Sequence, residues 1–222
     1  KDIYKNLKKQ NKVKSSSLSA EYAFEKIGTP HLLIEFIYFI THGIMLYERL
    51  KEQILCIQNN ENSESIELIR KIVSAHTVGV PLNARNLALT IQSSKDPQFI
   101  FESLDQEFIS IQKSLVSGLH WVRSKHLFDI LHNDYIAKEQ TLADIVEFVP
   151  DEYRPFSIGN SIALLTDSNK DYIKILAKKT DIKDLSTVVN YIEGIFWGGE
   201  RIFVLQNKSL FDEMGTYGGY SS

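Results

Sequence analysis

The residues able to do chemistry in this 222-residue sequence form no recognisable catalytic signature. No histidine pair has the HExxH spacing, and no cysteine–histidine set has the spacing of a zinc site. No glycine is followed by lysine, so a phosphate-binding P-loop is absent, as are the GxGxxG and GxSxG motifs. We therefore expect that this chain alone is not an enzyme. The six histidines are His31, His42, His76, His120, His126 and His132.

A first motif of interest is Gly28-Thr29-Pro30, which precedes a very apolar stretch. In a purely structural interpretation, the glycine ends one helix in the left-handed conformation, the threonine caps the next, and the proline takes its first position. In a functional interpretation, the rigid proline ring packs against a flat purine base. The motif alone is compatible with both.

A second motif is Leu119-His120-Trp121-Val122-Arg123, where a predicted β-hairpin passes into a helix. The structural interpretation is a partly buried histidine that bonds to local backbone, with Trp121 in the core. The functional interpretation is a histidine that donates a hydrogen bond to a phosphate. This motif alone is also compatible with both.

The elements that position these motifs are predicted to be mostly helices. Ala20, Ala23, Phe24 and Ile27 have helical spacing, and further helices are expected at 31–41, 45–57, 66–75, 82–91 and from Asp96-Pro97 onward. Gly43 is expected to end the helix at 31–41. Alternating apolar residues then predict one small β-hairpin over 109–119. Three short helices followed by a hairpin are the outline of a winged helix.

Helices are predicted again after the hairpin. We expect one over 122–131, a capping box at Thr141-Leu142-Ala143-Asp144, and a last apolar stripe over 185–196 that ends at Gly198-Gly199. Short helices joined by short loops favour helical hairpins stacked as a small solenoid, although no clean internal period is found. The predicted fold class is therefore mainly α.

The two motifs taken together, with a winged helix between them, resemble the STAND class of P-loop NTPases. This class includes the apoptosome and plant resistance ATPases, the NACHT proteins and bacterial relatives. In these proteins the Gly-x-Pro proline of a helical lid packs against adenine, and a histidine of the winged helix contacts the ADP β-phosphate. The resemblance implies that Gly28, Pro30 and His120 bind the nucleotide. Thr29 and His31 replace commoner apolar residues, and Trp121 replaces an acidic residue of many members.

The resemblance also implies a domain organisation: a linker or frayed segment at 1–18, a helical lid at 19–60, a winged helix at 61–121, and a helical arm at 122–222 that begins a sensor or repeat region. ATP or ADP, with magnesium, is then held by a domain upstream of residue 1, and this chain alone binds neither. The implied partners are that domain, further copies on activation, and a protein ligand of the sensor. The implied role is a cytoplasmic regulatory switch, in antiviral defence or signalling.

Composition leaves two other functions open. The net charge of −3 does not favour a nucleic-acid partner, although six lysines lie within the first 14 residues, in a segment interpreted as a solvated linker rather than a nucleic-acid arm. The stretch 32–47 is too short and too polar to span a membrane. The alternatives are a DNA-binding winged-helix regulator and a helical adaptor that binds protein partners.

Overall fold

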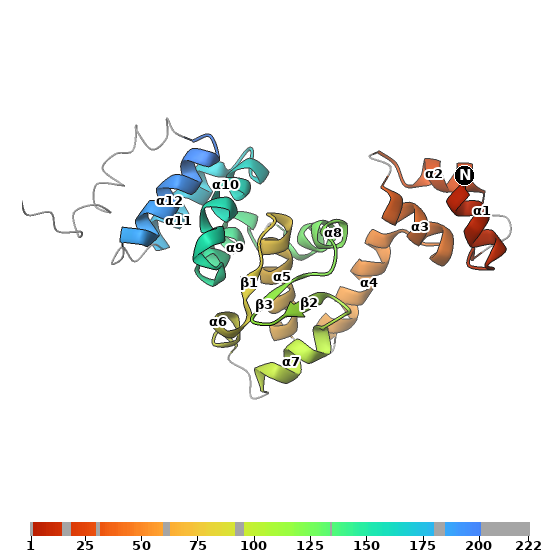
Figure 1. Cartoon of the computed structure of the whole chain (residues 1–222), viewed down its shortest axis with the longest axis horizontal. Coiled ribbons are helices and arrows are strands. Elements are labelled where there is room, and N and C mark those ends of the chain that lie inside the picture. Colours follow the sequence, from red (N-terminus) through yellow and green to blue (C-terminus); the bar gives the residue numbers. More distant parts are fainter. Residues whose placement is uncertain are drawn as a thin grey trace, which may run out of the picture. The chain divides into compact units, whose positions relative to one another are not determined.

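The computed structural model describes residues 2–14, 19–29, 32–59, 63–91, 96–133, 135–179 and 185–200. Within them the chain is mainly α-helical, with twelve α-helices and one three-stranded antiparallel sheet (Figure 1). The predicted fold class, mainly α, is confirmed. The chain divides into two compact units, Lys1–Glu61 and Asn62–Ser222.

The first unit contains four helices and a small apolar core formed mainly by the second and third of them. The four helices are α1 (Asp2–Lys9), α2 (Ala20–Lys26), α3 (Leu33–His42) and α4 (Leu46–Asn59). Apolar residues on one side of α2 and α3 are buried together, and half-buried side chains of α1 and of the α3–α4 connection pack against them. The cluster consists of Ala23, Ile27, Phe39 and Ile40, with Tyr4, Leu7, Phe36 and Met45 around it.

Two of the predicted helix ends in this unit are confirmed and one helix start is wrong. Gly28 and Gly43 adopt φ angles of 69° and 78°, the left-handed region that glycine reaches without steric penalty. The predicted N-cap at Thr29 is wrong, because α3 begins at Leu33 and its N-cap is Leu32, whose backbone is extended. Thr29 therefore lies too far from the first free N–H groups of α3 to cap them.

The second unit opens with helices and a sheet. Figure 1 shows α5 (Ser63–Thr77), α6 (Ala84–Ala88), α7 (Pro97–Leu104) and α8 (Trp121–Leu131) around strands β1 (Leu82–Asn83), β2 (Ile109–Gln112) and β3 (Leu115–Gly118). The strand order is β1-β3-β2, and both pairings are antiparallel. The register pairs Ile109 with Gly118 and Gln112 with Leu115, so the hairpin predicted over 109–119 is confirmed.

The helix predicted over 82–91 is wrong at its start. Leu82 and Asn83 form strand β1, paired with Val116 and Leu115 of β3, and the helix begins only at Ala84. Asn83 serves both elements, since its side-chain oxygen accepts a hydrogen bond from the Asn86 N–H at 3.1 Å and caps α6. A strand of two residues is too short to show an alternation of apolar and polar residues, so β1 is recognised only by its pairing with β3.

The remaining helices of this unit are α9 (Lys138–Ile145), α10 (Arg154–Leu164), α11 (Asn169–Lys179) and α12 (Leu185–Trp197), with 3-10 turns at Val146–Phe148 and Asp151–Tyr153. The predicted capping box at Thr141 is wrong, because α9 begins at Lys138 and Thr141 is buried inside it. Its hydroxyl forms tertiary contacts instead, as described below. The predicted end of the last stripe is confirmed: α12 ends at Trp197, and Gly199 has a φ of 85°.

These four helices pack in two layers, α9 on α11 and α10 on α12 (Figure 1). Helices α9 and α11 begin at residues 138 and 169, and α10 and α12 begin at 154 and 185, so the spacing is 31 residues in both pairs. Burial follows the same spacing, since Thr141, Leu142 and Ile145 of α9 correspond to Tyr172, Ile173 and Leu176 of α11. The structure thus contains a repeat whose unit is about one helical hairpin. The sequence alone did not reveal this repeat.

Candidate functional site

His120 occupies the junction between strand β3 and helix α8, as its motif predicts. Its backbone is extended, with φ −155° and ψ 137°, and it is the N-cap residue of α8. Its Nδ1 accepts a hydrogen bond from the Val122 N–H at 3.2 Å, and its carbonyl accepts one from the Ser124 N–H at 2.9 Å. The side chain is exposed. The structural interpretation is therefore right that His120 bonds to local backbone and wrong that the His120 side chain is partly buried.

The capping contact determines the chemistry that His120 offers. A ring nitrogen that accepts a hydrogen bond carries no proton, so the neutral ring must carry its proton on Nε2. The Nε2–H is then a donor on an exposed ring at the N-terminus of an 11-residue helix. The aligned peptide dipoles and free N–H groups at a helix N-terminus favour anions. The local geometry is therefore suited to a negatively charged oxygen.

A second histidine lies behind this junction. His76, near the end of α5, bonds through Nδ1 to Ser124 Oγ of α8 at 2.8 Å. Burial lowers the pKa of His76, and the nearby charge of His120 lowers it further. Gly118 of β3 leaves room for this contact, because a Cβ at Gly118 would meet both Ser124 Oγ and His76 Nδ1. The pair joins α5 to α8, and Gly118 of β3 lies against it.

The Ser124–His76 pair has the residue types of a nucleophile and its base, but not the access that catalysis requires. Ser124 is only 1% exposed and packed against Gly118, so a substrate cannot reach its hydroxyl. We interpret the pair as a support that positions the β3–α8 junction. Sequence reasoning missed it because the two residues lie 48 positions apart and match no motif.

Trp121 differs from the structural interpretation of its motif, which placed it in the core. The indole is 48% exposed, and Lys125 Nζ lies 5.4 Å from the centre of its ring. Trp121 is the first residue of α8 and Val122 is the second. Consecutive residues of a helix point in different directions, so the face that buries Val122 leaves the Trp121 ring exposed. His120, Trp121 and Lys125 thus form an exposed, partly cationic edge at the N-terminal end of α8.

The other two predicted site residues belong to the first unit. Gly28 follows α2 in the left-handed conformation, is exposed, and has no atom within 4 Å of where a Cβ would lie. Pro30 lies outside the described residues. Gly28 and His120 are on different compact units, and the structure describes each only within its own unit.

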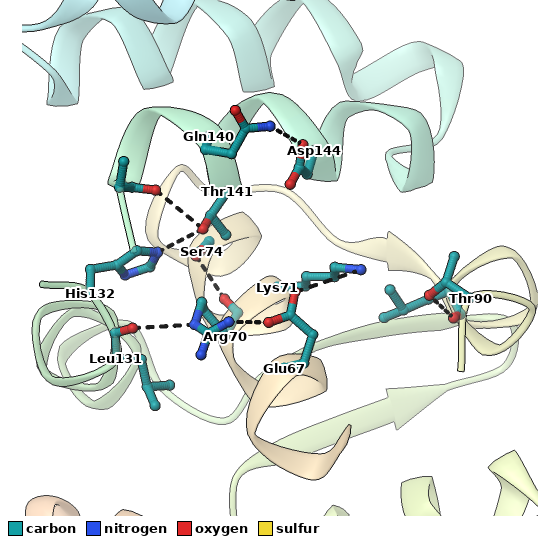
Figure 2. A network of polar contacts seen from close by, with 12 residues as sticks. Glu67, Arg70, Lys71, Ser74, Thr90, Leu131, His132, Gln140, Thr141 and Asp144 are labelled. Carbon is teal, nitrogen blue, oxygen red and sulfur yellow. Dashed lines mark hydrogen bonds and ion pairs between the residues drawn. The ribbon is translucent and has the colours of Figure 1, made fainter. Parts of the chain in front are cut away.

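A buried polar network joins α5, α8 and α9, as Figure 2 shows. His132, at the C-terminal end of α8, is 7% exposed; its Nδ1 lies 2.6 Å from the Phe128 carbonyl and its Nε2 lies 3.0 Å from Thr141 Oγ1. Because a carbonyl only accepts, Nδ1 carries the proton and Nε2 accepts from the threonine hydroxyl.

Arg70 of α5 donates through Nε to the Leu131 carbonyl at 3.2 Å and forms an ion pair with Glu67. The network fixes α9 on the preceding helices.

The pH dependence of stability should reveal this network. The pKa of His132 is lowered mainly by burial and also by the charges of Arg70 and Lys138, although the bond to Phe128 and the Asp129 carboxylate act in the opposite direction. Below pH about 6.5 the His132 ring is therefore protonated in the unfolded chain, whereas the folded chain keeps it neutral to a lower pH. We expect the contribution of His132 to the urea midpoint to be constant above that pH and to decrease below it.

The contribution of each histidine with a lowered pKa is at most about 1.4 kcal/mol per pH unit. His76 adds to the effect of His132, since its pKa is lowered as well. Urea unfolding at pH 7.5 and pH 5.5 should thus show a smaller loss of stability for His132→Gln than for the unchanged chain. Equal losses in both proteins would contradict the assignment.

Among the described residues, no group of three or more histidine, cysteine, aspartate or glutamate side chains is placed to hold a metal ion. None of the helices that the structure describes is long and apolar enough to cross a membrane. Comparison of the chain with protein-family models, curated proteins and solved structures finds no match.

Proposed function

We propose that this chain is the regulatory switch portion of a STAND-type ATPase, which closes over ADP or ATP held by an upstream domain of the same polypeptide. In this proposal residues 19–60 are the helical lid, 61–121 the winged helix, and 122–222 the helical arm that begins a sensor. Opening couples a protein ligand of the sensor to homo-oligomerisation in the cytoplasm. The resemblance extends to bacterial antiviral defence and signalling proteins.

The order of the elements in the second unit supports a winged-helix assignment. Helices α5, α6 and α7 precede the β2–β3 hairpin, and β1, between α5 and α6, completes the sheet in the order β1-β3-β2. This is the order in which a winged helix is built. The pairing of α9 with α11 and of α10 with α12 supports a solenoid-like arm.

The observation that carries the proposal is the exposed His120 at the N-terminus of α8. Its Nδ1 is occupied by the helix cap, so its Nε2–H remains as a donor toward an anion. The helix N-terminus favours the same negative charge. A nucleotide phosphate fits this arrangement, as the resemblance implies for His120. Gly28 and Pro30 would contribute the purine contact from the lid.

The experiment that tests the proposal is the analysis of nucleotide carried by the purified full-length polypeptide. We expect acid extraction and chromatography to release about one ADP per chain, because the closed state retains its nucleotide. The segment 1–222 should carry none and bind ATP weakly, since it lacks the glycine loop whose N–H groups hold phosphates. A full-length protein without nucleotide, or micromolar ATP affinity of the segment, would contradict the proposal.

The alternative of a DNA-binding winged helix draws support from the same element order, with α7 as the helix expected to enter a groove. The charge of α7 and its ends opposes it, because Asp96, Glu102, Asp105 and Glu107 would face the phosphates. Titration of random duplex DNA at low salt separates the two functions. Submillimolar affinity with a steep loss on adding salt would favour the regulator.

A further inference from the structure

Two exposed aromatic rings meet on the layer formed by α10 and α12. Phe156 of α10 is 48% exposed and Trp197 of α12 is 53% exposed. Their ring centres are 4.6 Å apart with an interplanar angle of 71°, an edge-to-face contact. Aromatic side chains dominate the energetics of protein interfaces, so an exposed pair in mutual contact is a surface on which a partner can gain binding energy.

Each ring has a carboxylate one helical turn before it. Glu193 precedes Trp197 by four residues within α12, the spacing that places two side chains on one face. Glu152 precedes Phe156 by four residues, in the 3-10 turn that leads directly into α10. Both glutamates are exposed, and among the described residues neither forms an ion pair. The aromatic surface is thus bordered by two negative charges that no cation of the described chain neutralises.

The backbone beneath this surface holds it rigid. Glycines at the helix contact let α10 and α12 approach closely: a Cβ at Gly159 would lie 3.2 Å from Trp197 Cβ and 3.3 Å from the Gly194 carbonyl oxygen. The close approach brings Trp197 beside Phe156. Because both rings stand on packed helices rather than on loops, a ligand would not need to order them on binding.

We propose that Phe156, Trp197, Glu152 and Glu193 form a docking site for an arginine side chain, presented by a basic peptide segment of a partner protein. A guanidinium stacks on aromatic faces and forms paired hydrogen bonds with carboxylates, whereas an ammonium offers only a point charge. The two glutamates repel nucleic acids and anionic membranes, which leaves a cationic protein segment as the occupant. The site lies on the proposed sensor arm but does not depend on the nucleotide switch.

Fluorescence anisotropy of a fluorescein-labelled nona-arginine peptide, titrated with the 1–222 chain, tests the site. We expect Glu152→Gln/Glu193→Gln to weaken binding about two- to thirtyfold, the range that two exposed ion pairs provide. Phe156→Leu should weaken it about two- to fivefold, as expected for one exposed cation–π contact. The unchanged chain should prefer nona-arginine over nona-lysine, and Phe156→Leu should reduce that preference.

A matched control separates a specific site from general attraction between a basic peptide and an acidic protein. Glu64→Gln/Glu102→Gln also removes two negative charges, from α5 and α7 of the second unit rather than from α10 or α12. This variant should bind nona-arginine as the unchanged chain does, and all variants should keep their circular dichroism spectra and melting temperatures. An equal loss in the control, an unaltered Phe156→Leu, or no binding of the peptide at all would overturn the proposal. None of these outcomes bears on ADP retention by the full-length polypeptide.

Discussion

Replacing His120 with alanine in the full-length polypeptide is expected to accelerate ADP release about 10- to 150-fold. The exposed Nε2–H is the proposed donor to a phosphate oxygen, and a hydrogen bond to a charged group contributes about 1.5–3 kcal/mol. A contact made only in the closed state changes the closed population by its full differential energy. Stopped-flow measurement of fluorescent ADP dissociation, with the oligomer fraction from light scattering, checks this.

A serine at position 120 provides the matched control. Serine caps helices well, so His120→Ser keeps α8 capped while its short side chain does not reach where the imidazole Nε2 lies. We expect Ser and Ala to release ADP equally fast, whereas only Ala loses the cap, at about 1 kcal/mol of stability. If ADP release and oligomer fraction are unchanged in both variants, His120 is a helix cap only.

A second large effect is expected for Gly194→Ala, which should destabilise the second unit by about 2 kcal/mol. A Cβ at this position would lie 2.6 Å from Ile158 Cβ and 2.9 Å from the Pro155 carbonyl oxygen, so α10 and α12 must move apart. Overpacking of this kind costs about 1–3 kcal/mol, and rotamer changes do not relieve contacts with Cβ and backbone atoms. A Cβ–Cβ distance as short as 2.6 Å places the cost at the upper end of that range, about 3 kcal/mol, which exceeds by about 2 kcal/mol the gain of about 1 kcal/mol that alanine has over glycine in a helix.

Thermal unfolding of the 1–222 chain, followed by circular dichroism, measures the effect of Gly194→Ala. A loss of about 2 kcal/mol corresponds to a melting temperature lower by about 4–8 °C in a chain of this size. Asn190→Ala, in the same helix and partly exposed, gains helix preference of up to about 0.7 kcal/mol without the clash and should be neutral or stabilising. A Gly194→Ala protein that melts at or above the unchanged temperature would contradict close packing of α10 and α12.

Local signals in the sequence were sufficient for most helices and their ends. Apolar residues at helical spacing located α4, α5 and α12, since one buried face is enough to produce that pattern. Gly28, Gly43 and Gly199 were recognised as helix ends because the left-handed conformation favours glycine wherever it occurs. The single change to an alternating period predicted the β2–β3 hairpin for an equally local reason.

The candidate site was only partly predictable. The β-to-helix junction at His120 followed from the hairpin and from the helix after it, but the direction of its ring did not. Exposure of Trp121 and burial of Ser124 depend on which face of α8 meets α5 and β3, and this is a property of packing. The contact between His76 and Ser124 likewise exists only because two distant helices meet.

By itself, then, the sequence determined the mainly α class, the hairpin and the position of His120, because short-range periodicity and backbone preference act within a few residues. The tertiary structure alone decided where β1 pairs, where α9 begins and which helices stack 31 residues apart. Those features depend on contacts between segments remote in sequence. Thr141 illustrates the difference: its neighbours in sequence predict a helix cap, whereas the His132 ring, its neighbour in space, makes it a buried hydrogen-bond partner inside the helix.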